Sequence, residues 1–209
     1  MRVKVCGNTS AEGARAAIKA GADMLGFIMA PGSPRTLTVE RARELVGELP
    51  PEVDSVGVFV DAAPGEVAEV AREVGFTAVQ LHGVERWDDW SGFDLPVLKA
   101  VRVGGAGIAD PGWPPASILL ADTHDPGLDG GTGKTFAWDV AQDLAWRYRL
   151  VVSGGLGPDN VAAAIRRLEP WGVDASSRLE SAPGVKDPAL VRAFVAAARD
   201  AESEVAARG

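Results

Sequence analysis

Reactive and polar side chains stand at the ends of several short apolar runs in this sequence. Cys6, the only cysteine in the chain, directly follows RVKV and precedes a glycine, and Asp122 ends the run SILLAD. A lone cysteine is commonly a small buried hydrophobe, but a thiol at a strand end can also be reactive. An aspartate in such a place can either cap a loop or take part in a site.

Three further polar residues occupy comparable positions. Arg35 lies in PGSPR after the run MLGFIM, and Gln80 and His82 fall in AVQLHG. An arginine in a loop can be a solvated surface residue, and a histidine at a strand end can simply hydrogen-bond a neighbouring loop. The ends of the apolar runs are nonetheless unusually polar, which favours a site there.

Two glycine-rich segments differ in how well they fit phosphate binding. GGTGKT, residues 130–135, resembles the end of a Walker A loop, but five residues separate Gly127 from Gly133 where the motif has four. SGGL, residues 153–156, is followed by GPDNV, a pattern typical of a strand end leading into a helix N-terminus that binds a phosphate monoester. Together with DASS, residues 174–177, it matches the phosphate site of loops seven and eight in parallel barrels.

The pattern of apolar runs predicts the elements that must position these residues. Eight β-rich runs alternate with mostly helical stretches, which favours a single-domain (β/α)₈ barrel over residues 1–209 rather than an open doubly wound sheet. The fingerprint G-x-G-x-x-G is absent after the first run, which also weakens the open-sheet alternative. The connections after the fourth and fifth runs are too short or too rich in Gly and Pro for regular helices. The runs are RVKVC, MLGFIM, SVGVFV, AVQLHG, LPVLKAV, SILLAD, LVVSGG and GVDASS.

Helix boundaries follow from capping residues. Thr9 with Glu12 predicts a capping box at the first helix, and Pro158 is expected to open another helix in its first turn. Asp187 before Pro188 is the expected N-cap of the last helix. The tail, residues 200–209, is expected to fray.

Composition limits the possible partners. The formal net charge of −8 argues against nucleic acid, whose binding proteins usually carry a basic face. The N-terminus leads into no long apolar region, and no run approaches the length of a membrane span, so we expect neither a signal peptide nor a membrane partner. A single cysteine cannot form an internal disulfide, and we expect a cytoplasmic protein.

Several motifs, in this order along the chain, carry a family resemblance. They are VKVCGNT, GSPR, VGVFV, VQLHG, LLADT, GGTGKTFAW, SGGLGPDNV, VDASS and PGVKD, spread over residues 3–187. Taken together, they resemble the phosphoribosylanthranilate isomerase family of tryptophan biosynthesis. The resemblance implies a (β/α)₈ barrel that needs no cofactor or metal and converts N-(5-phosphoribosyl)anthranilate into its 1-deoxyribulose 5-phosphate isomer.

The resemblance also implies roles for individual residues. Cys6 matches the family's general base and Asp122 its general acid. Arg35, Gln80, His82, Gly130 and Gly131 match positions that bind the substrate or close the site. The positions matching the phosphate site are Gly154, Gly155, Asp174, Ser176 and Ser177.

Two departures and several alternatives stay open. Arg178 stands where the family usually has glycine, so it can either reach the phosphate or crowd the loop, and Gly32 replaces a common lysine. A histidine-pathway or dual-specificity phosphoribosyl isomerase typically uses an aspartate in the place of Cys6. A metal-dependent epimerase needs a ligand cluster that two histidines do not suggest. A non-catalytic sugar-phosphate-binding barrel is the alternative of another class, and either a monomer or a homodimer is possible, with a monomer favoured.

Overall fold

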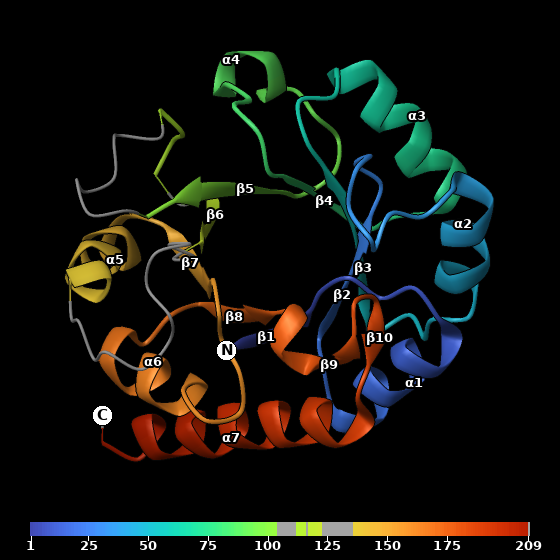
Figure 1. Ribbon diagram of the computed structural model, residues 1–209. Helices are drawn as coiled ribbons and strands as arrows, with labels where there is room; N and C mark the ends of the chain where they lie inside the picture. Colours follow the sequence, from blue (N-terminus) through green and yellow to red (C-terminus); the bar gives the residue numbers. More distant parts are fainter. Residues whose placement is uncertain (104–111, 116, 123–135, 209) are drawn as a thin grey trace.

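The computed structural model describes residues 1–103, 112–115, 117–122 and 136–208, except for the side chains of residues 136–140. In these residues eight parallel strands pair in sequence order, and β8 pairs with β1 to close a barrel (Figure 1). The predicted barrel is therefore confirmed, and each of the eight apolar runs contains one strand. The strands are β1 (Arg2–Val5), β2 (Met24–Ile28), β3 (Asp54–Phe59), β4 (Ala78–Leu81), β5 (Val97–Arg102), β6 (Ile118–Asp122), β7 (Arg149–Ser153) and β8 (Gly172–Ala175).

Helices surround the barrel in the described part of the chain, and α7 runs along one side of it beside α1 and α6 (Figure 1). They are α1 (Ala11–Ala20), α2 (Val39–Gly47), α3 (Pro64–Val74), α4 (Trp87–Trp90), α5 (Phe136–Arg147), α6 (Val161–Leu168) and α7 (Pro188–Ala206). The helix after β4 has only four residues, as the sequence predicts. Residues 104–111 of the second irregular connection lie outside the described residues.

The structure corrects two of the three predicted helix ends. Ser10, not Thr9, caps α1, because its side chain accepts a hydrogen bond from the backbone N–H of Gly13. α6 begins at Val161 rather than at Pro158, since the side chain of Asn160 folds back to accept from Gly157 N–H and residues 158–160 form turns. Asp187 is the N-cap of α7, as predicted.

The tail also differs from the expectation of fraying. α7 continues to Ala206, and two acidic side chains of its last turns form ion pairs with other elements. Glu202 pairs with the N-terminal ammonium of Met1, and Glu204 lies 2.7 Å from Arg166 of α6. Ala198 and Ala201 are completely buried. These contacts explain why the helix extends beyond residue 200.

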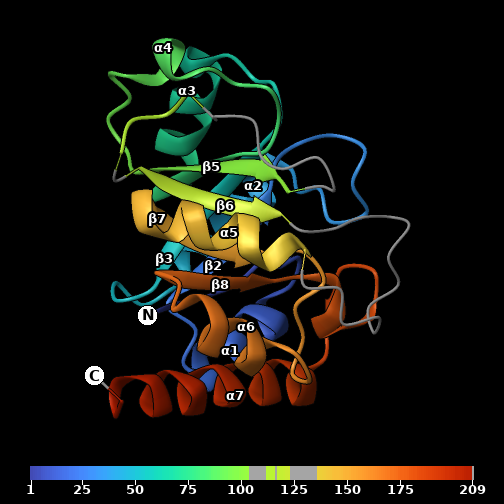
Figure 2. The same ribbon diagram turned by 90° about the vertical axis from the view of Figure 1, so that its left-hand side faces the viewer.

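A feature that sequence reasoning missed lies after β8. Residues Ser177–Leu179 form a short 3₁₀ helix, η1, followed by an antiparallel pair of strands, β9 (Glu180–Ala182) and β10 (Val185–Lys186). The hairpin lies on the side of the barrel toward which β5 and β6 point, while both termini lie on the opposite side (Figure 2). It therefore adds side chains to the carboxyl ends of the strands.

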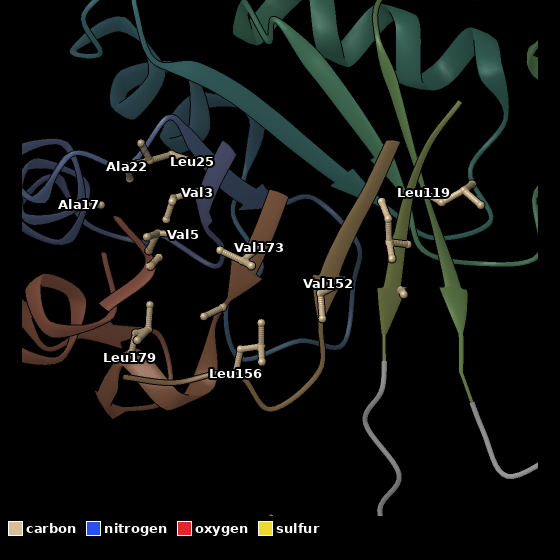
Figure 3. Close-up of a cluster of buried hydrophobic side chains, with 14 of the residues drawn as sticks. Val3, Val5, Ala17, Ala22, Leu25, Leu119, Val152, Leu156, Val173 and Leu179 are labelled. Atoms are coloured by element: carbon tan, nitrogen blue, oxygen red, sulfur yellow. The ribbon is translucent and has the colours of Figure 1, made fainter. Parts of the chain in front are cut away.

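The core determines which side chains of β1 enter the barrel. Val3 and Val5 are completely buried and belong to the same apolar cluster as Ala17 of α1 and Leu25 of β2 (Figure 3). Because neighbouring residues of a strand point to opposite faces, Lys4 and Cys6 face the barrel interior. The helix-facing valines thus place an ammonium and a thiol inside the barrel.

Candidate active site

The predicted site residues lie at the carboxyl ends of five strands. Cys6 follows β1, Gln80 is in β4, Asp122 ends β6, and Gly154 and Ser176 follow β7 and β8. Parallel strands that close into a barrel bring these ends to one mouth, where barrel enzymes have their active sites. In the closed order, β7 and β8 lie between the strand of Asp122 and the strand of Cys6.

Cys6 is held at the edge of the barrel interior, with only 6% of its surface exposed. Its N–H donates to the carbonyl of Ala175 in β8. A Cβ atom placed on Gly26 would lie 2.6 Å from the sulfur and 3.0 Å from Nζ of Lys4. Glycine at this position of β2 is therefore what gives the thiol and the ammonium room to lie close together.

Lys4 and Asp174 form a buried ion pair below the thiol. Lys4 Nζ donates to Asp174 Oδ1 over 3.0 Å, and the two side chains are 0% and 6% exposed. Ser153 Oγ donates to the other carboxylate oxygen, also over 3.0 Å. The carboxylate is thus bound to groups inside the barrel, and the contribution of Asp174 to the phosphate site stays a prediction.

Burial and these charges act in opposite directions on the thiol. Burial raises the pKa of Cys6, the nearby ammonium of Lys4 lowers it, and the carboxylate of Asp174 raises it, with a net rise. Burial lowers the pKa of Lys4, but its interactions with Asp174 and Cys6 outweigh burial and raise it overall. Lys4 therefore stays charged beside the sulfur.

Arg35 joins the loop after β2 to the hairpin after β8. Its Nε and Nη2 donate to the two oxygens of Glu180 over 2.8 and 2.6 Å, a bidentate pair. Lys186 donates to the same carboxylate over 2.7 Å and to the carbonyl of Ser176 over 3.2 Å. Burial raises the pKa of Glu180, but the two cations outweigh it and hold the pKa at about 2.

The same arginine lies against the turn that follows Cys6. Gly7 has a φ of +75°, and a Cβ there would lie 2.6 Å from Cδ of Arg35 and 2.9 Å from Oγ of Ser176. A residue other than glycine would push both side chains away from this turn. The structure therefore brings Arg35, Cys6 and Ser176 together, as the predicted site requires.

His82 connects Gln80 to Asp122 at the opposite side of the mouth. Nε2 of Gln80 lies 3.0 Å from Nδ1 of His82, and Nε2 of His82 lies 3.4 Å from Oδ2 of Asp122. An amide N–H that donates to Nδ1 leaves the imidazole proton on Nε2, directed at the carboxylate. Oε1 of Gln80 is buried without a hydrogen-bond partner among the described residues.

The glycine-rich turn after β7 and the 3₁₀ helix after β8 lie next to each other. Gly154 and Gly155 have φ angles of +84° and +68°. Arg178 of η1 donates to the carbonyl of Gly155 over 3.0 Å and to Asp159 over 2.9 Å. Arg178 thus ties the turn to η1, while the sequence leaves open whether it reaches the phosphate or crowds the loop.

A second buried lysine pair lies on the side of β4 and β5. Lys99 Nζ is 2.8 Å from Glu85 and 2.7 Å from the carbonyl of Gly83, and the two charged side chains are 6% and 4% exposed. A cavity of about 710 Å³ opens here, with Lys99, His82 and Trp87 in its wall. The cavity reaches the mouth at His82, away from Cys6.

Sequence reasoning missed three charged residues of the site: Lys4, Glu180 and Lys186. Lys4 had a usable signal, because it is two residues before Cys6 on a strand and must share its face. The sequence holds no comparable signal for Glu180 and Lys186, because it is the hairpin of β9 and β10 that brings them to the site. Of the predicted residues, Gly130 and Gly131 lie outside the described residues.

Among the described residues no group of three or more His, Cys, Asp or Glu side chains is arranged to hold a metal ion.

A closed parallel barrel with a thiol, a carboxylate and a glycine turn at the carboxyl ends of its strands is that of a (β/α)₈-barrel enzyme. Residues 3–197 match the family model of N-(5'phosphoribosyl)anthranilate (PRA) isomerase. The chain belongs to this family, and the resemblance seen in the sequence is confirmed.

Relatives agree over almost the full length. The N-(5'-phosphoribosyl)anthranilate isomerase of Rubrobacter xylanophilus is 50% identical over 203 residues, which cover 95% of this chain and 98% of the relative. The crystal structure of phosphoribosyl anthranilate isomerase from Thermotoga maritima has a TM-score of 0.84 at 39% identity, covering 96% of this chain and 99% of the other.

A further crystal structure contains a ligand. It is a phosphoribosyl anthranilate isomerase in complex with reduced 1-(o-carboxyphenylamino)-1-deoxyribulose 5-phosphate, with a TM-score of 0.82 and 36% identity, over 96% of this chain and 99% of the other.

Proposed function

We propose that this enzyme catalyses the Amadori rearrangement of N-(5'-phosphoribosyl)anthranilate, with Asp122 as general acid and Cys6 as general base and without a cofactor. One observation carries the proposal. The two residues end strands β6 and β1 at one mouth, and the glycine turn and serines after β7 and β8 lie between those strands. A phosphate held there places the ribose between acid and base.

The reaction is proposed to begin at Asp122. Its carboxylic acid protonates the ribose ring oxygen, the bond between C1 and that oxygen breaks, and the nitrogen lone pair forms a C1=N Schiff base. His82, 3.4 Å from the carboxylate, orients the acid. A correctly placed acid of this kind contributes about 10²–10⁴-fold to a rate.

Cys6 is proposed to act second. Its thiolate takes the proton from C2, the C–H electron pair forms a C1=C2 double bond, and the C1=N pair returns to nitrogen. The resulting enolamine takes a proton at C1 and loses the proton of its C2 hydroxyl group, which becomes the ketone, so the overall reaction consumes and releases no proton. The thiol is placed for this step by the backbone bond to Ala175 and by the space over Gly26.

Binding is proposed to use both ends of the mouth. Ser176, Ser177 and the turn at Gly154 and Gly155 support a phosphate site, because backbone N–H groups at such turns bind anions. Arg35 supports a site for the anthranilate carboxylate. Glu180 accepts from two of the five N–H donors of Arg35 and fixes its guanidinium beside Cys6, and the remaining donors can bind a carboxylate.

A fluorescence assay tests the proposal. The wild-type protein is mixed with freshly generated phosphoribosylanthranilate, and in parallel with the phosphoribosyl substrate of the histidine-pathway isomerase. Rapid consumption of the first substrate alone is the expected result. Consumption of both would indicate dual specificity, and binding of a product analogue by folded protein without any turnover would indicate a non-catalytic barrel.

Assembly and location are proposed from the surface and composition. The exposed large apolar side chains among the described residues are Val60, Val84, Trp146 and Val185. Val60 and Val84 line the cavity, whereas Trp146 is in α5 and Val185 in β10, so no large exposed apolar patch is seen among them, which supports a monomer. Light scattering coupled to size-exclusion chromatography measures the oligomeric state.

No helix in the described part of the chain is long and apolar enough to cross a membrane. The single cysteine supports a cytoplasmic location.

A further inference from the structure

The charged groups inside the barrel are more numerous around Cys6 than the proposed acid–base chemistry requires. Lys4 is 0% exposed, although lysine is almost never completely buried unless it is paired. Its partner Asp174 is itself buried and receives a second hydrogen bond from Ser153. Replacing a buried ion pair by apolar residues is often neutral or stabilising, so stability alone gives a weak reason for this pair.

The position of the pair points to the thiol. Lys4 is in β1, and Cys6 follows it two residues later, directly after the strand, so the two side chains point to the same inner face. The sulfur and Nζ both border the point where a Cβ on Gly26 would lie, at 2.6 and 3.0 Å. An ammonium has three N–H donors, and Asp174 accepts one of them. The sulfur thus lies within the field of a cation that solvent does not screen.

We propose that Lys4 is a positioning residue, fixed by Asp174 and Ser153, that stabilises the thiolate form of Cys6 for proton abstraction. The proposal rests on the proposed role of Cys6 as the base. Asp174 fixes the ammonium below the sulfur, and Ser153 fixes Asp174. The lysine touches no substrate and acts only through the thiol.

Other charges near the sulfur are already engaged. Lys186 and Arg35 approach from the hairpin and from the loop after β2, and both are bound to Glu180 at 2.6–2.8 Å. Burial lowers the pKa of Lys186, and its interactions with Glu180 oppose this. These two cations therefore face Cys6 with one carboxylate, that of Glu180, shared between them. Lys4 has a carboxylate as well, but its ammonium is the strongest influence opposing burial on the pKa of Cys6.

The two members of the pair are expected to affect the thiol in opposite directions. Lys4→Met removes a positive charge beside the sulfur, so the pKa of Cys6 should rise. Asp174→Asn removes a negative charge and leaves the ammonium to face the sulfur, so the pKa of Cys6 should fall. If Lys4 only filled space, the two substitutions would not shift the pKa of Cys6 in opposite directions.

The thiolate is measured by its absorbance near 240 nm as pH is raised, without substrate. The chain has one cysteine, so subtraction of the Cys6→Ser spectrum isolates a single thiol. Lys4→Met is expected to titrate at higher pH than the wild type or to give no thiolate signal below pH 10, and Asp174→Asn at lower pH. At neutral pH, kcat of Lys4→Met should fall about 10²–10⁴-fold, with partial recovery as pH rises and little change in KM.

Two controls make the result specific. Lys99→Met removes the lysine of the other buried pair at the mouth, 2.8 Å from Glu85, and should leave the titration of Cys6 at its wild-type position. The double variant Lys4→Met/Asp174→Asn removes both charges of the pair, so neither is left buried without its partner. It replaces Lys4→Met in the titration if that single variant does not fold. This double variant is expected to titrate between the wild type and Lys4→Met, because Lys4 affects the thiol more than Asp174 does.

The outcomes separate this proposal from the one on which it rests. Unchanged titration in all Lys4 and Asp174 variants, or shifts of both single variants in the same direction, would overturn the role of Lys4 whatever the activities. Opposite shifts establish that Lys4 controls the thiol. If Cys6→Ser then retained full turnover, the role of Cys6 as base would fall while the link between Lys4 and the thiol stood.

Discussion

The two sides of the mouth are built differently. On the side of β1 and β8, Lys4, Cys6 and Asp174 are almost completely buried and are surrounded by charged partners. On the side of β4 and β6, His82 and Asp122 have side chains that are 30% and 24% exposed. The base therefore lies in a closed environment and the acid in an open one.

This difference separates two ways of placing a reactive group. Inside the barrel, charges interact strongly because little water screens them, so removing one partner of an ion pair near Cys6 should lower stability as well as rate. At the open side, water screens the charges and supplies protons. Substitutions near Cys6 should therefore change both stability and rate, whereas substitutions near Asp122 should change rate alone.

The largest effects are expected for the reacting groups themselves. Cys6→Ser and Asp122→Asn should each lower kcat about 10²–10⁴-fold, because each removes one proton-transfer step. Steady-state kinetics with phosphoribosylanthranilate measures this, and circular dichroism checks the fold. Asp88→Asn, at an exposed aspartate of α4, is the matched control and should keep wild-type kcat. Near-normal turnover of both variants would show that the acid–base assignment is wrong.

Glu180→Gln should have the largest effect on stability. Its pKa of about 2 lies below the ordinary 4.5, since Arg35 and Lys186 outweigh burial. The carboxylate thus contributes stability above pH 4.5, and this contribution is lost as pH falls toward 2. Removing it leaves two cations without their partner and should cost about 3 kcal/mol at pH 7.

Urea unfolding at several pH values measures this cost, and the variant should show a flatter loss between pH 4.5 and 2 than the wild type. Glu48→Gln breaks an exposed pair with Arg15 and should change the free energy of unfolding by less than about 1 kcal/mol. Equal effects of the two substitutions would remove the distinction between a closed and an open environment.

His82→Asn tests the open side. It removes the imidazole that faces Asp122 and should lower kcat about tenfold, equivalent to ~1.4 kcal/mol of transition-state stabilisation. The free energy of unfolding should change by no more than about 0.5 kcal/mol, as for a surface substitution. Kinetics and urea unfolding of the same preparation give both values. A large loss of stability with unchanged kcat would contradict the assigned orienting role.

Arg178→Ala should give the smallest effect. It frees the turn at Gly155 and Asp159 from η1, so KM should rise about threefold, ~0.7 kcal/mol, at nearly constant kcat. The control is Arg166→Ala, which breaks another exposed pair, with Glu204, away from the mouth. A fall in KM would instead mean that the arginine hinders phosphate binding.

Local patterns in the sequence were sufficient for the barrel. Each strand was visible because its apolar run is short and nearly continuous, as in MLGFIM and SVGVFV. The sequence alone does not identify the N-cap of α1, since Thr9 and Ser10 are both common capping residues. The hydrogen bond from Gly13 N–H to the side chain of Ser10 decides between them. Strand ends also located Cys6 and Asp122 at one mouth.

The remaining parts of the site depend on contacts between distant residues. Glu180 is 145 residues from Arg35, and Asp174 is 170 residues from Lys4. No local pattern reveals that such charges meet. The motif DASS places Asp174 next to the predicted phosphate-site serines, but it does not reveal that the carboxylate binds Lys4. The contact between His82 and Asp122 was hidden in the same way.

The pairing of β1 with β8 has a consequence for synthesis of the chain. Lys4 is made 170 residues before Asp174, which binds it, and Cys6 is likewise made long before its partner Ala175. Until β8 has been made, Cys6 lacks the strand that buries it and is open to oxidants. A domain folds as a unit, so this exposure lasts at least while the intervening residues are synthesised. The period of greatest chemical vulnerability for this enzyme thus precedes its first catalytic cycle.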